Sequence, residues 1–468
     1  MTDPKNKSLQ FRTCGKSNEL TGQNPDLSSM AGVTHLFIVV SNYPFGYGEP
    51  FLETELRFLA DRFNRIHIIT TEPCQHEDQQ FVLPYNAEVI HAGKTYNWWQ
   101  KLINVWRLFF DDVVKEELRN IREVSQGNIS LGVLKTLVVS RTKSLRLQHK
   151  LDELVSHRTG AKDQVFLYSY WCSEYAHSIA ELGKKNPEYT TLARAHGWDL
   201  YFERSAYDYL PFRLSIFNDL DAVFTISENG RNYLLAKFDQ LVDSNKIISS
   251  RLGIRTGRSK KEIHRRFRRF RIVSCSNLIS IKRVDLLIRS LALIDDLEIE
   301  WIHFGEGALM AELKTLAGQF LGPKTNVSFN FRGRVPNWEL INYYSENEID
   351  LFVTVSKWDG IPVSIMEAMS FGIPTVATNV GGVAEIVLDG ENGILLTTDP
   401  QTQEVAQALI EVAKMPDQQY MILRARAQEI WGTFYSARVN YPIFCDRIFD
   451  LRKSNESLEK ETHLKKVV

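Results

Sequence analysis

The segment DLFVTVSKWDGIPVSIMEAMSFGIPTVATN, residues 350–379, contains the pattern that decides the fold. A β-rich run at residues 350–356 leads into a short loop, and Pro362 then opens a stretch of helical character, as proline often does. A second β-rich run follows at residues 374–379. Strands and helices that alternate in this way predict a parallel sheet covered by helices on both faces.

The same alternation runs through the rest of the chain as two series, joined near residues 251–260. The fold class is therefore α/β, with two Rossmann-like, doubly wound domains that face each other across a cleft. Such sheets bind ligands at the carboxyl ends of their strands, so we expect the ligand site between the domains. The expected strands begin near His35, Arg65, Ala87, Val165, Thr190, Ala222 and Lys246, and then near Phe270, Ile299, Asn326, Asp350 and Pro374.

The domain plan has five parts. Residues 1–33 form a polar leader without an apolar core, which predicts disorder. Residues 34–255 form the first Rossmann-like domain, and residues 256–433 form the second. Residues 434–452 predict a helix that crosses back to the first domain, and residues 453–468 a charged tail.

Composition excludes several classes of protein. The 56 Lys and Arg residues balance 57 Asp and Glu residues, so net charge gives no reason to expect a nucleic-acid partner. No apolar run approaches the roughly 18 residues that span a bilayer, and we expect a cytoplasmic protein. Five scattered cysteines without a C-x-x-C pair indicate reduced thiols, and we expect neither a zinc site nor another metal site.

Two stretches leave the regular pattern. Residues 97–124 are amphipathic and rich in aromatic side chains, among them Trp98, Trp99 and Trp106. They predict either a helix packed on its own domain or one inserted at an anionic lipid surface. Residues 258–271 are a basic run, which predicts either a solvated linker or a contact with lipid headgroups. Peripheral contact with the inner face of a membrane therefore stays open.

Asp359 and Glu367 are the two acids of the opening segment. The first turn of the helix between them offers N–H groups and the positive end of the helix dipole to an anion. Carboxylates accept hydrogen bonds from hydroxyl groups, and Gly360 lets a ligand approach the backbone closely. An anion site flanked by two such acids suits a sugar nucleotide. The alternative is an acid that only stabilises the helix terminus.

These residues carry a resemblance to a known family. Residues 356–387 resemble the signature of retaining glycosyltransferases of family 4, which have the GT-B fold: two acids separated by seven residues, then Ala-Met, Gly-x-Pro and Gly-Gly-x-x-Glu. The segments RAHGWDLYFER and SNYPFGYGEPFLETE resemble those of exopolysaccharide members of the colanic-acid type. The resemblance covers roughly residues 34–449, and it implies that the first domain binds the acceptor and the second binds the nucleotide sugar. Matching positions are Glu367, Ala368, Met369, Gly372, Pro374, Gly381, Gly382 and Glu385.

The resemblance implies an activity. It implies transfer of a sugar, with retained anomeric configuration, from a nucleotide-sugar donor to a glycan or lipid-linked acceptor in cell-surface polysaccharide biosynthesis. No metal or other cofactor is implied, because the nucleotide sugar is itself a substrate. Two alternatives stay open: a nucleotide-sugar epimerase or hydrolase of the same fold, and a weakly active GT-B protein that serves as an assembly partner.

The resemblance also implies roles for single residues. Glu367 would bind ribose, Asp359 the transferred sugar, and Lys282 the departing diphosphate, while His196 would lie near the sugar. The family's acid at residue 359 is Glu, and its Arg at residue 277 is Asn here, with Arg283 the nearest cation to compensate. Further donor-binding candidates are Gly360, Ile361, Pro362, Val363, Asn277, Gly305, Glu306 and Arg334, and the first loop contributes Gly46, Gly48 and Glu49.

Overall fold

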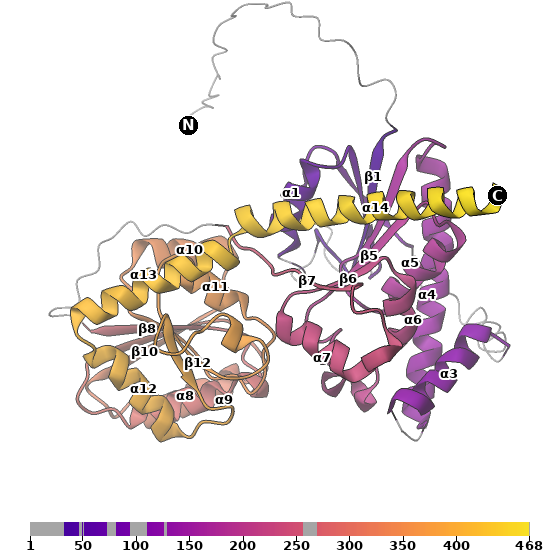
Figure 1. The fold of residues 1–468 in the computed structure, drawn as a ribbon. Coiled ribbons are helices and arrows are strands. Elements are labelled where there is room, and N and C mark those ends of the chain that lie inside the picture. The colour runs from indigo at the N-terminus through magenta and orange to yellow at the C-terminus, as the bar shows by residue number, and fades with distance from the viewer. Residues whose placement is uncertain are drawn as a thin grey trace, which may run out of the picture.

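The computed structural model describes residues 32–45, 49, 51–72, 81–93, 110–125, 129–255 and 269–467. Within these ranges the chain forms two parallel sheets, each flanked by helices. The two sheets, with their helices, lie side by side in Figure 1. The predicted fold class is therefore confirmed. The polar leader lies outside the described residues.

The first sheet has seven parallel strands in the order β3-β2-β1-β4-β5-β6-β7. The central strands are buried almost throughout, which explains their continuous apolar sequences. The strands are β1 (Thr34–Val40), β2 (Arg65–Thr70), β3 (Ala87–His91), β4 (Gln164–Ser169), β5 (Thr190–Ala195), β6 (Ala222–Thr225) and β7 (Ile247–Ser249).

The second sheet has six parallel strands in the order β10-β9-β8-β11-β12-β13. All twelve expected strands occur within one residue of their expected starts, and β13 is a strand that the sequence pattern did not predict. The strands are β8 (Phe270–Cys275), β9 (Ile299–Phe304), β10 (Val327–Gly333), β11 (Leu351–Thr354), β12 (Thr375–Thr378) and β13 (Gly393–Leu396).

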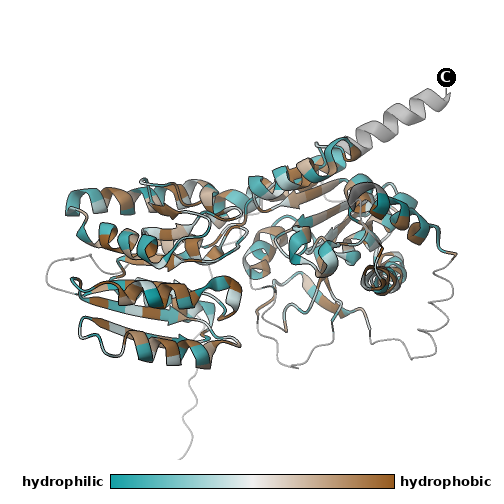
Figure 2. Cartoon of the chain, turned by 90° about the horizontal axis from the view of Figure 1, so that it is seen from below, coloured by the Kyte–Doolittle hydropathy of each residue, from teal (hydrophilic) through white to brown (hydrophobic). Residues whose placement is uncertain are grey.

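Helices connect most successive strands in both domains, and Figure 2 shows apolar residues on the strands and on the helix faces that meet them. The first domain contains α1 (Leu52–Ala60), α3 (Asp112–Ser125), α4 (Leu131–Arg158), α5 (Glu174–Lys185), α6 (Arg213–Asp219) and α7 (Glu228–Phe238). The second contains α8 (Val284–Ala292), α9 (Met310–Phe320), α10 (Asn337–Glu346), α11 (Val363–Ser370), α12 (Thr402–Lys414) and α13 (Asp417–Phe434).

Strand order reverses once in each sheet. In the first sheet β1 pairs with both β2 and β4, and in the second β8 pairs with both β9 and β11. The loops after β1 and β4 therefore diverge to opposite faces, as do the loops after β8 and β11. Doubly wound sheets bind ligands in the opening that this divergence leaves.

Two segments that connect the domains lie side by side. Ile254 N donates to Tyr435 O (3.0 Å), and Ala437 N donates to Ile254 O (2.9 Å). Gly253 allows this approach, because a Cβ there would lie 2.5 Å from the Cα of Ala437. The chain then continues as α14 (Ala437–Val467), which runs back across the first domain in Figure 1 and packs against α1.

A buried ion pair lies beneath α14. The side chains of Arg194 and Glu55 are both fully buried, with Arg194 Nη2 3.2 Å from Glu55 Oε2. The hydroxyl of Tyr168 accepts from Arg194 Nε (3.0 Å) and donates to Glu55 Oε1 (2.8 Å). Phe444 of α14 covers the guanidinium, with its ring centroid 4.1 Å from Arg194 Cζ. The C-terminal helix thus seals charged groups inside the first domain.

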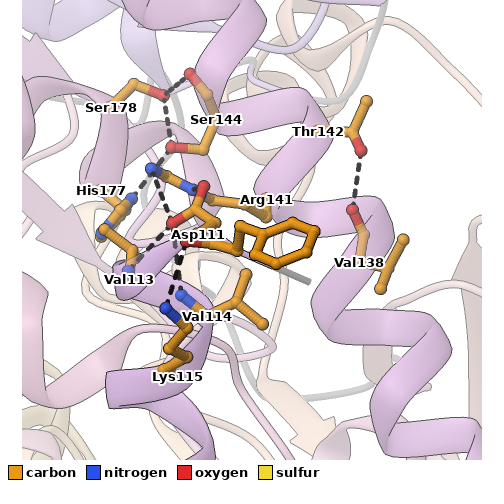
Figure 3. Close-up of polar contacts among 11 residues, drawn as sticks. Asp111, Val113, Val114, Lys115, Val138, Arg141, Thr142, Ser144, His177 and Ser178 are labelled. Atoms are coloured by element: carbon orange, nitrogen blue, oxygen red, sulfur yellow. Dashed lines mark hydrogen bonds and ion pairs between the residues drawn. The ribbon is translucent and has the colours of Figure 1, made fainter. Parts of the chain in front are cut away.

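The amphipathic stretch is described only from residue 110 onward, and its three tryptophans lie outside the described residues. The described part, α3, packs on its own domain. Asp111 accepts from Val113 N (2.9 Å) at the start of α3 and from Arg141 Nε of α4 (2.9 Å), as Figure 3 shows. Val114 is buried in the domain core. The basic run is described only from residue 269, and Arg271 there pairs with Glu300 (2.7 Å).

Replacing Arg194 tests how strongly the buried pair holds the first domain. Arg194→Met leaves the Glu55 carboxylate buried without its cation, so we expect a loss of about 3–5 kcal/mol in the free energy of unfolding. Urea unfolding followed by fluorescence gives the value. The matched control is Arg57→Met, which breaks a surface pair with Glu53 (2.6 Å) and is expected to cost less than about 1 kcal/mol. Equal losses in both variants would contradict the assigned role.

Candidate active site

Lys282 and Asp359 meet where the strand order of the second sheet reverses. A short 3₁₀ turn (Ser280–Lys282) follows β8 and ends at Lys282, and Asp359 lies in the loop after β11. Their side chains form an ion pair between Lys282 Nζ and Asp359 Oδ1. The second carboxylate oxygen, Asp359 Oδ2, is buried and has no hydrogen-bond partner. The sequence assigned these residues separate ligand groups; in the structure they neutralise each other.

The loop that carries Asp359 is fixed by two glycines. A Cβ at Gly381, where φ is +55°, would lie 1.8 Å from the carbonyl oxygen of Asp359. Gly382 N donates to Gly360 O (2.8 Å), and a Cβ at Gly382 would crowd the same carbonyl. Glycine is therefore required at both positions of the Gly-Gly pair. The pair supports the loop from behind.

Helix α11 begins directly after this loop. Its first helical residue is Val363, one residue later than the sequence pattern predicts. Pro362 is the N-cap residue. Ile361 is buried and anchors the loop in the domain core. Because the first N–H groups of a helix have no partners within it, Gly360 and the start of α11 form a surface suited to an anion.

Glu367 lies in the second turn of α11 and is almost fully buried. Asn337, at the start of α10, donates from Nδ2 to Glu367 Oε1 (2.6 Å). Burial raises the pKa of Glu367 to about 7, although the hydrogen bond from Asn337 acts in the opposite direction. Its carboxyl group is therefore partly protonated at neutral pH.

The other donor-site candidates of the second domain lie along the same edge of the sheet. Asn277 is exposed in the loop after β8. Gly305 has φ +135°, and a Cβ there would lie 1.9 Å from Ser276 O, so the turn after β9 packs tightly on that loop. Glu306 in this turn forms an exposed ion pair with Arg334 (2.9 Å). Each of these residues thus lies at or after the carboxyl end of β8, β9 or β10.

Arg283 is engaged within its own domain. Its Nε donates to Val355 O (2.8 Å), and its Nη1 pairs with Asp399 (2.5 Å). Arg283 also takes the left-handed conformation, with φ +46°, at the N-cap of α8. Lys282 and Arg283 thus hold different partners, and only Lys282 contacts Asp359.

Glu49 holds together the loops of the first domain at its own strand reversal. Its oxygens accept hydrogen bonds from Ser41 N (2.6 Å), Asn42 N (3.1 Å) and Tyr43 N (3.0 Å). The indole Nε1 of Trp171, which follows β4, donates to the same carboxylate (2.6 Å). Glu49 is 1% exposed, so the structure assigns it to the loop and not to a ligand surface. The loop glycines Gly46 and Gly48 lie outside the described residues.

His196 lies directly after β5 in a loop organised by Asp199. Asp199 Oδ1 accepts from His196 N and Gly197 N (both 2.9 Å), and Oδ2 accepts from Cys172 N (2.9 Å). Burial would raise the pKa of Asp199, but the His196 ring and these donors hold it below its usual range. The ring of His196 is 10% exposed; its Nδ1 lies 3.8 Å from Asp199 Oδ2, and its Nε2 has no hydrogen-bond partner.

The loops of the two domains touch at His196 and Gly360. A Cβ at Gly360 would lie 3.4 Å from the carbonyl oxygen of His196. Beside this contact, Trp358 of the second domain packs edge-on against Tyr201 of the first, with ring centroids 4.7 Å apart. Arg204 Cζ lies 4.0 Å above the Trp358 ring. His196 and the Asp359 loop therefore form one site.

Arg204 was not identified from the sequence. Burial lowers its pKa, while the charges of Asp359 and Asp199 oppose that shift, which places the guanidinium near both carboxylates. The guanidinium adds a positive charge to the site from the first domain. A signal was present, because Arg204 ends the quoted segment RAHGWDLYFER.

Glu385 joins the domains on the far side of the Gly-Gly pair. Its carboxylate accepts from Glu228 N (3.0 Å) and Asn229 N (2.7 Å) at the start of α7, and Arg251 Nη2 lies 3.4 Å away. A carboxylate at a helix N-terminus is favourable because it meets unpaired N–H groups and the helix dipole. The sequence marked Glu385 as part of a motif without showing that it caps a helix of the other domain.

Within the residue ranges that the structure describes, no group of three His, Cys, Asp or Glu side chains is arranged to hold a metal ion. None of the helices in those ranges combines the length and apolar character needed to cross a membrane.

Residues 258–429 match the family model described as glycosyl transferases group 1. Curated relatives align over shorter segments. An uncharacterized glycosyltransferase of Methanocaldococcus jannaschii, MJ1069, is 30% identical over 204 residues, which is 42% of this chain and 50% of the relative. The lipopolysaccharide core biosynthesis mannosyltransferase LpsB of Rhizobium meliloti is 34% identical over 82 residues, or 17% and 19% of the two chains. The chain thus spans half of the length of MJ1069 and about a fifth of the length of LpsB.

Solved structures resemble about nine-tenths of this chain. Anabaena HepE in complex with UDP has a TM-score of 0.62 and 16% identity, covering 89% of this chain and all of HepE. Sucrose-phosphate synthase of Thermosynechococcus elongatus has a TM-score of 0.66 and 13% identity, covering 90% and 100%. The glycosyl transferases group 1 region therefore forms the second half of a GT-B fold.

The raised pKa of Glu367 gives a test by pH. If its carboxylate accepts hydrogen bonds from ribose hydroxyls, binding needs the ionised form, and that form becomes dominant as pH rises through about 7. We expect the dissociation constant of a bound nucleotide sugar to fall about tenfold between pH 6 and pH 8. Calorimetric titration with UDP-glucose and GDP-mannose measures it.

Glu367→Gln should remove this pH dependence, because the amide does not titrate in that range. Glu339→Gln, which changes an exposed carboxyl group of α10, should leave it intact. A slope that persists in Glu367→Gln would show that another group titrates.

Proposed function

We propose that the protein is a retaining glycosyltransferase that transfers a sugar from a nucleotide-sugar donor to a glycan or lipid-linked acceptor. The observation that carries the proposal is the meeting of Lys282, Asp359 and the start of α11 opposite His196 of the other domain. Four kinds of ligand contact are available there: a cation, a hydroxyl-binding carboxylate, a helix N-terminus and a histidine. The match to glycosyl transferases group 1 supports the same activity.

In the proposed complex the donor lies along the edge of the second sheet. Glu367 would accept hydrogen bonds from the ribose hydroxyls, and Asp359 from hydroxyls of the transferred sugar. The start of α11 and Lys282 would meet the diphosphate. Charge accumulates on the diphosphate as its bond to the anomeric carbon breaks, so a fixed ammonium group and oriented N–H groups stabilise the transition state more than the ground state.

Retention follows if the acceptor attacks from the face that the diphosphate leaves. The bond between the anomeric carbon and the phosphate oxygen breaks with its electrons passing to the phosphate. The acceptor hydroxyl forms the new bond on the same face and passes its proton to the departing phosphate oxygen. In this scheme the chain supplies position and charge, and no side chain becomes covalently attached to the sugar.

The Lys282–Asp359 pair adds a condition to donor binding. A nucleotide sugar would take Lys282 onto its diphosphate and offer sugar hydroxyls to Asp359 in exchange. A nucleoside diphosphate would take Lys282 but leave the carboxylate, whose Oδ2 is already unpaired, without a partner. Since an unpaired buried charge is costly, the pair should favour the intact donor over the spent nucleotide.

We also propose that the reaction needs no metal ion, with the cell-surface acceptor met in the cytoplasm at the inner face of the membrane. The roles of two relatives support this setting: one acts in lipopolysaccharide core biosynthesis, and another, from Salmonella typhi, in Vi polysaccharide biosynthesis. HepE, a structural neighbour, was solved with UDP and glucose.

The direct test is a panel of nucleotide sugars. We expect one donor to raise the melting temperature, because a ligand at a hundred times its dissociation constant stabilises the folded state by about 2.7 kcal/mol. Turnover with that donor should survive EDTA, and NMR of the product should show the donor's anomeric configuration. Release of free sugar as the sole product would indicate a hydrolase, and inversion would exclude the retaining mechanism.

Asp359→Asn separates the two parts of the proposed exchange, which are the binding of the diphosphate by Lys282 and the binding of sugar hydroxyls by Asp359. We expect nucleoside diphosphate affinity to rise several-fold, because Lys282 is released, while turnover falls by roughly tenfold to a hundredfold. Lys282→Ala should weaken both nucleotide and nucleotide sugar. Calorimetry and steady-state rates measure these effects, and Lys357→Ala, which removes an exposed lysine of the same loop, is the matched control. Unchanged nucleoside diphosphate affinity in Asp359→Asn would contradict the exchange.

A further inference from the structure

Two tryptophans lie beside His196 on the first domain. Trp171 follows β4, and its ring centroid is 4.6 Å from that of His196 and 5.2 Å from that of Trp198. Trp198 is 47% exposed, although tryptophan is usually well buried. The two indoles thus form a continuous aromatic surface that reaches from His196 to solvent.

The orientation of Trp171 is fixed by its neighbours. Its indole Nε1 donates to the buried carboxylate of Glu49 (2.6 Å), and its ring packs edge-on against Tyr170 at 5.4 Å. Trp198 is held through the next residue, because Asp199 anchors the loop by three backbone hydrogen bonds. A ligand would therefore meet an aromatic surface that is already ordered, which lowers the entropy cost of binding.

A polar atom without a partner lies at the inner end of this surface. His196 is nine-tenths buried; its Nδ1 lies 3.8 Å from Asp199 Oδ2, whereas its Nε2 has no partner. Buried polar atoms in this condition are uncommon and costly, which points to a ligand that supplies the missing hydrogen bonds.

An aromatic surface that ends at an unsatisfied ring nitrogen suits one chemical class. The face of a sugar ring carries C–H groups that pack on an indole, and its edge carries hydroxyls that need hydrogen-bond partners. An acyl chain would leave His196 Nε2 without a hydrogen bond. We infer that Trp171 and Trp198 bind a sugar ring of the acceptor, with a ring hydroxyl directed toward His196.

This inference rests on the proposed glycosyltransferase activity and narrows it. Its residues belong to the first domain, whereas the proposed donor contacts belong to the second. The acceptor would thus be recognised through a saccharide, whatever lies beyond that ring. The aromatic surface determines which acceptors bind and leaves the binding of the nucleotide unaffected.

Saturation-transfer NMR tests saccharide binding directly. The probes are methyl glycosides and disaccharides of glucose, galactose, mannose and N-acetylglucosamine, added to the full chain. We expect at least one to bind, and Trp198→Ala to weaken it roughly tenfold. Trp198→Phe should restore most of the affinity, since a ring face is what the saccharide needs. The matched control is Tyr85→Ala, which removes an exposed aromatic residue next to the amino end of β3, at the opposite edge of the sheet.

Parallel measurements separate the possible failures. UDP and GDP binding, followed by melting temperature, reports the proposed function and should be equal in wild type and Trp198→Ala. Absence of saccharide binding in wild type, or equal affinity in Trp198→Ala, overturns the acceptor inference alone. Absence of nucleotide and nucleotide-sugar binding overturns the proposed function. Flotation with phosphatidylglycerol vesicles that depends on Trp198, without saccharide binding, would identify a membrane contact and overturn the inference.

Discussion

The reversal of strand order in each sheet is the constraint on which the candidate site depends. At each reversal two loops leave the sheet toward opposite faces, and a carboxylate bridges the opening between them: Glu49 holds the Trp171 indole, and Asp359 holds the Lys282 ammonium. The two bridges differ in kind. Glu49 is saturated by four donors and is therefore structural, whereas Asp359 retains an unpartnered oxygen and is available for chemistry. The same topology thus gives one rigid edge and one reactive edge.

The fold could be predicted from the sequence because the patterns that indicate strands and helices are local. Buried parallel strands produce unbroken apolar runs, and each run was visible by itself. The strand β13 was not predicted, because it has only four residues, follows a turn and shows little periodicity. Site geometry depends on pairs that are distant in the chain. Lys282 and Asp359 are 77 residues apart, and Glu385 and Asn229 are 156 apart, so no local pattern could show that they meet.

Several site residues stand in segments that the sequence analysis quoted, but the sequence assigned them no role. Asp199 and Arg204 stand in the same segment as His196, yet their functions as loop anchor and as second cation follow only from burial and from the approach of the second domain. The sequence placed Glu367 in the motif as its second acid. Its raised pKa follows from its burial, a tertiary property that residue type and spacing do not encode.

The packing of α14 has a consequence for synthesis on the ribosome. Phe444, Cys445 and Ile448 belong to the same apolar cluster as the central strands of the first domain, and Phe444 covers Arg194. The domain that emerges first therefore lacks part of its core until nearly the whole chain has been made. Until then the Arg194–Glu55 pair is open on one side, and an apolar surface is exposed. In the second domain, the cluster that runs from Phe270 to Tyr420 is made entirely of residues that precede α14, so it is able to form before that helix emerges.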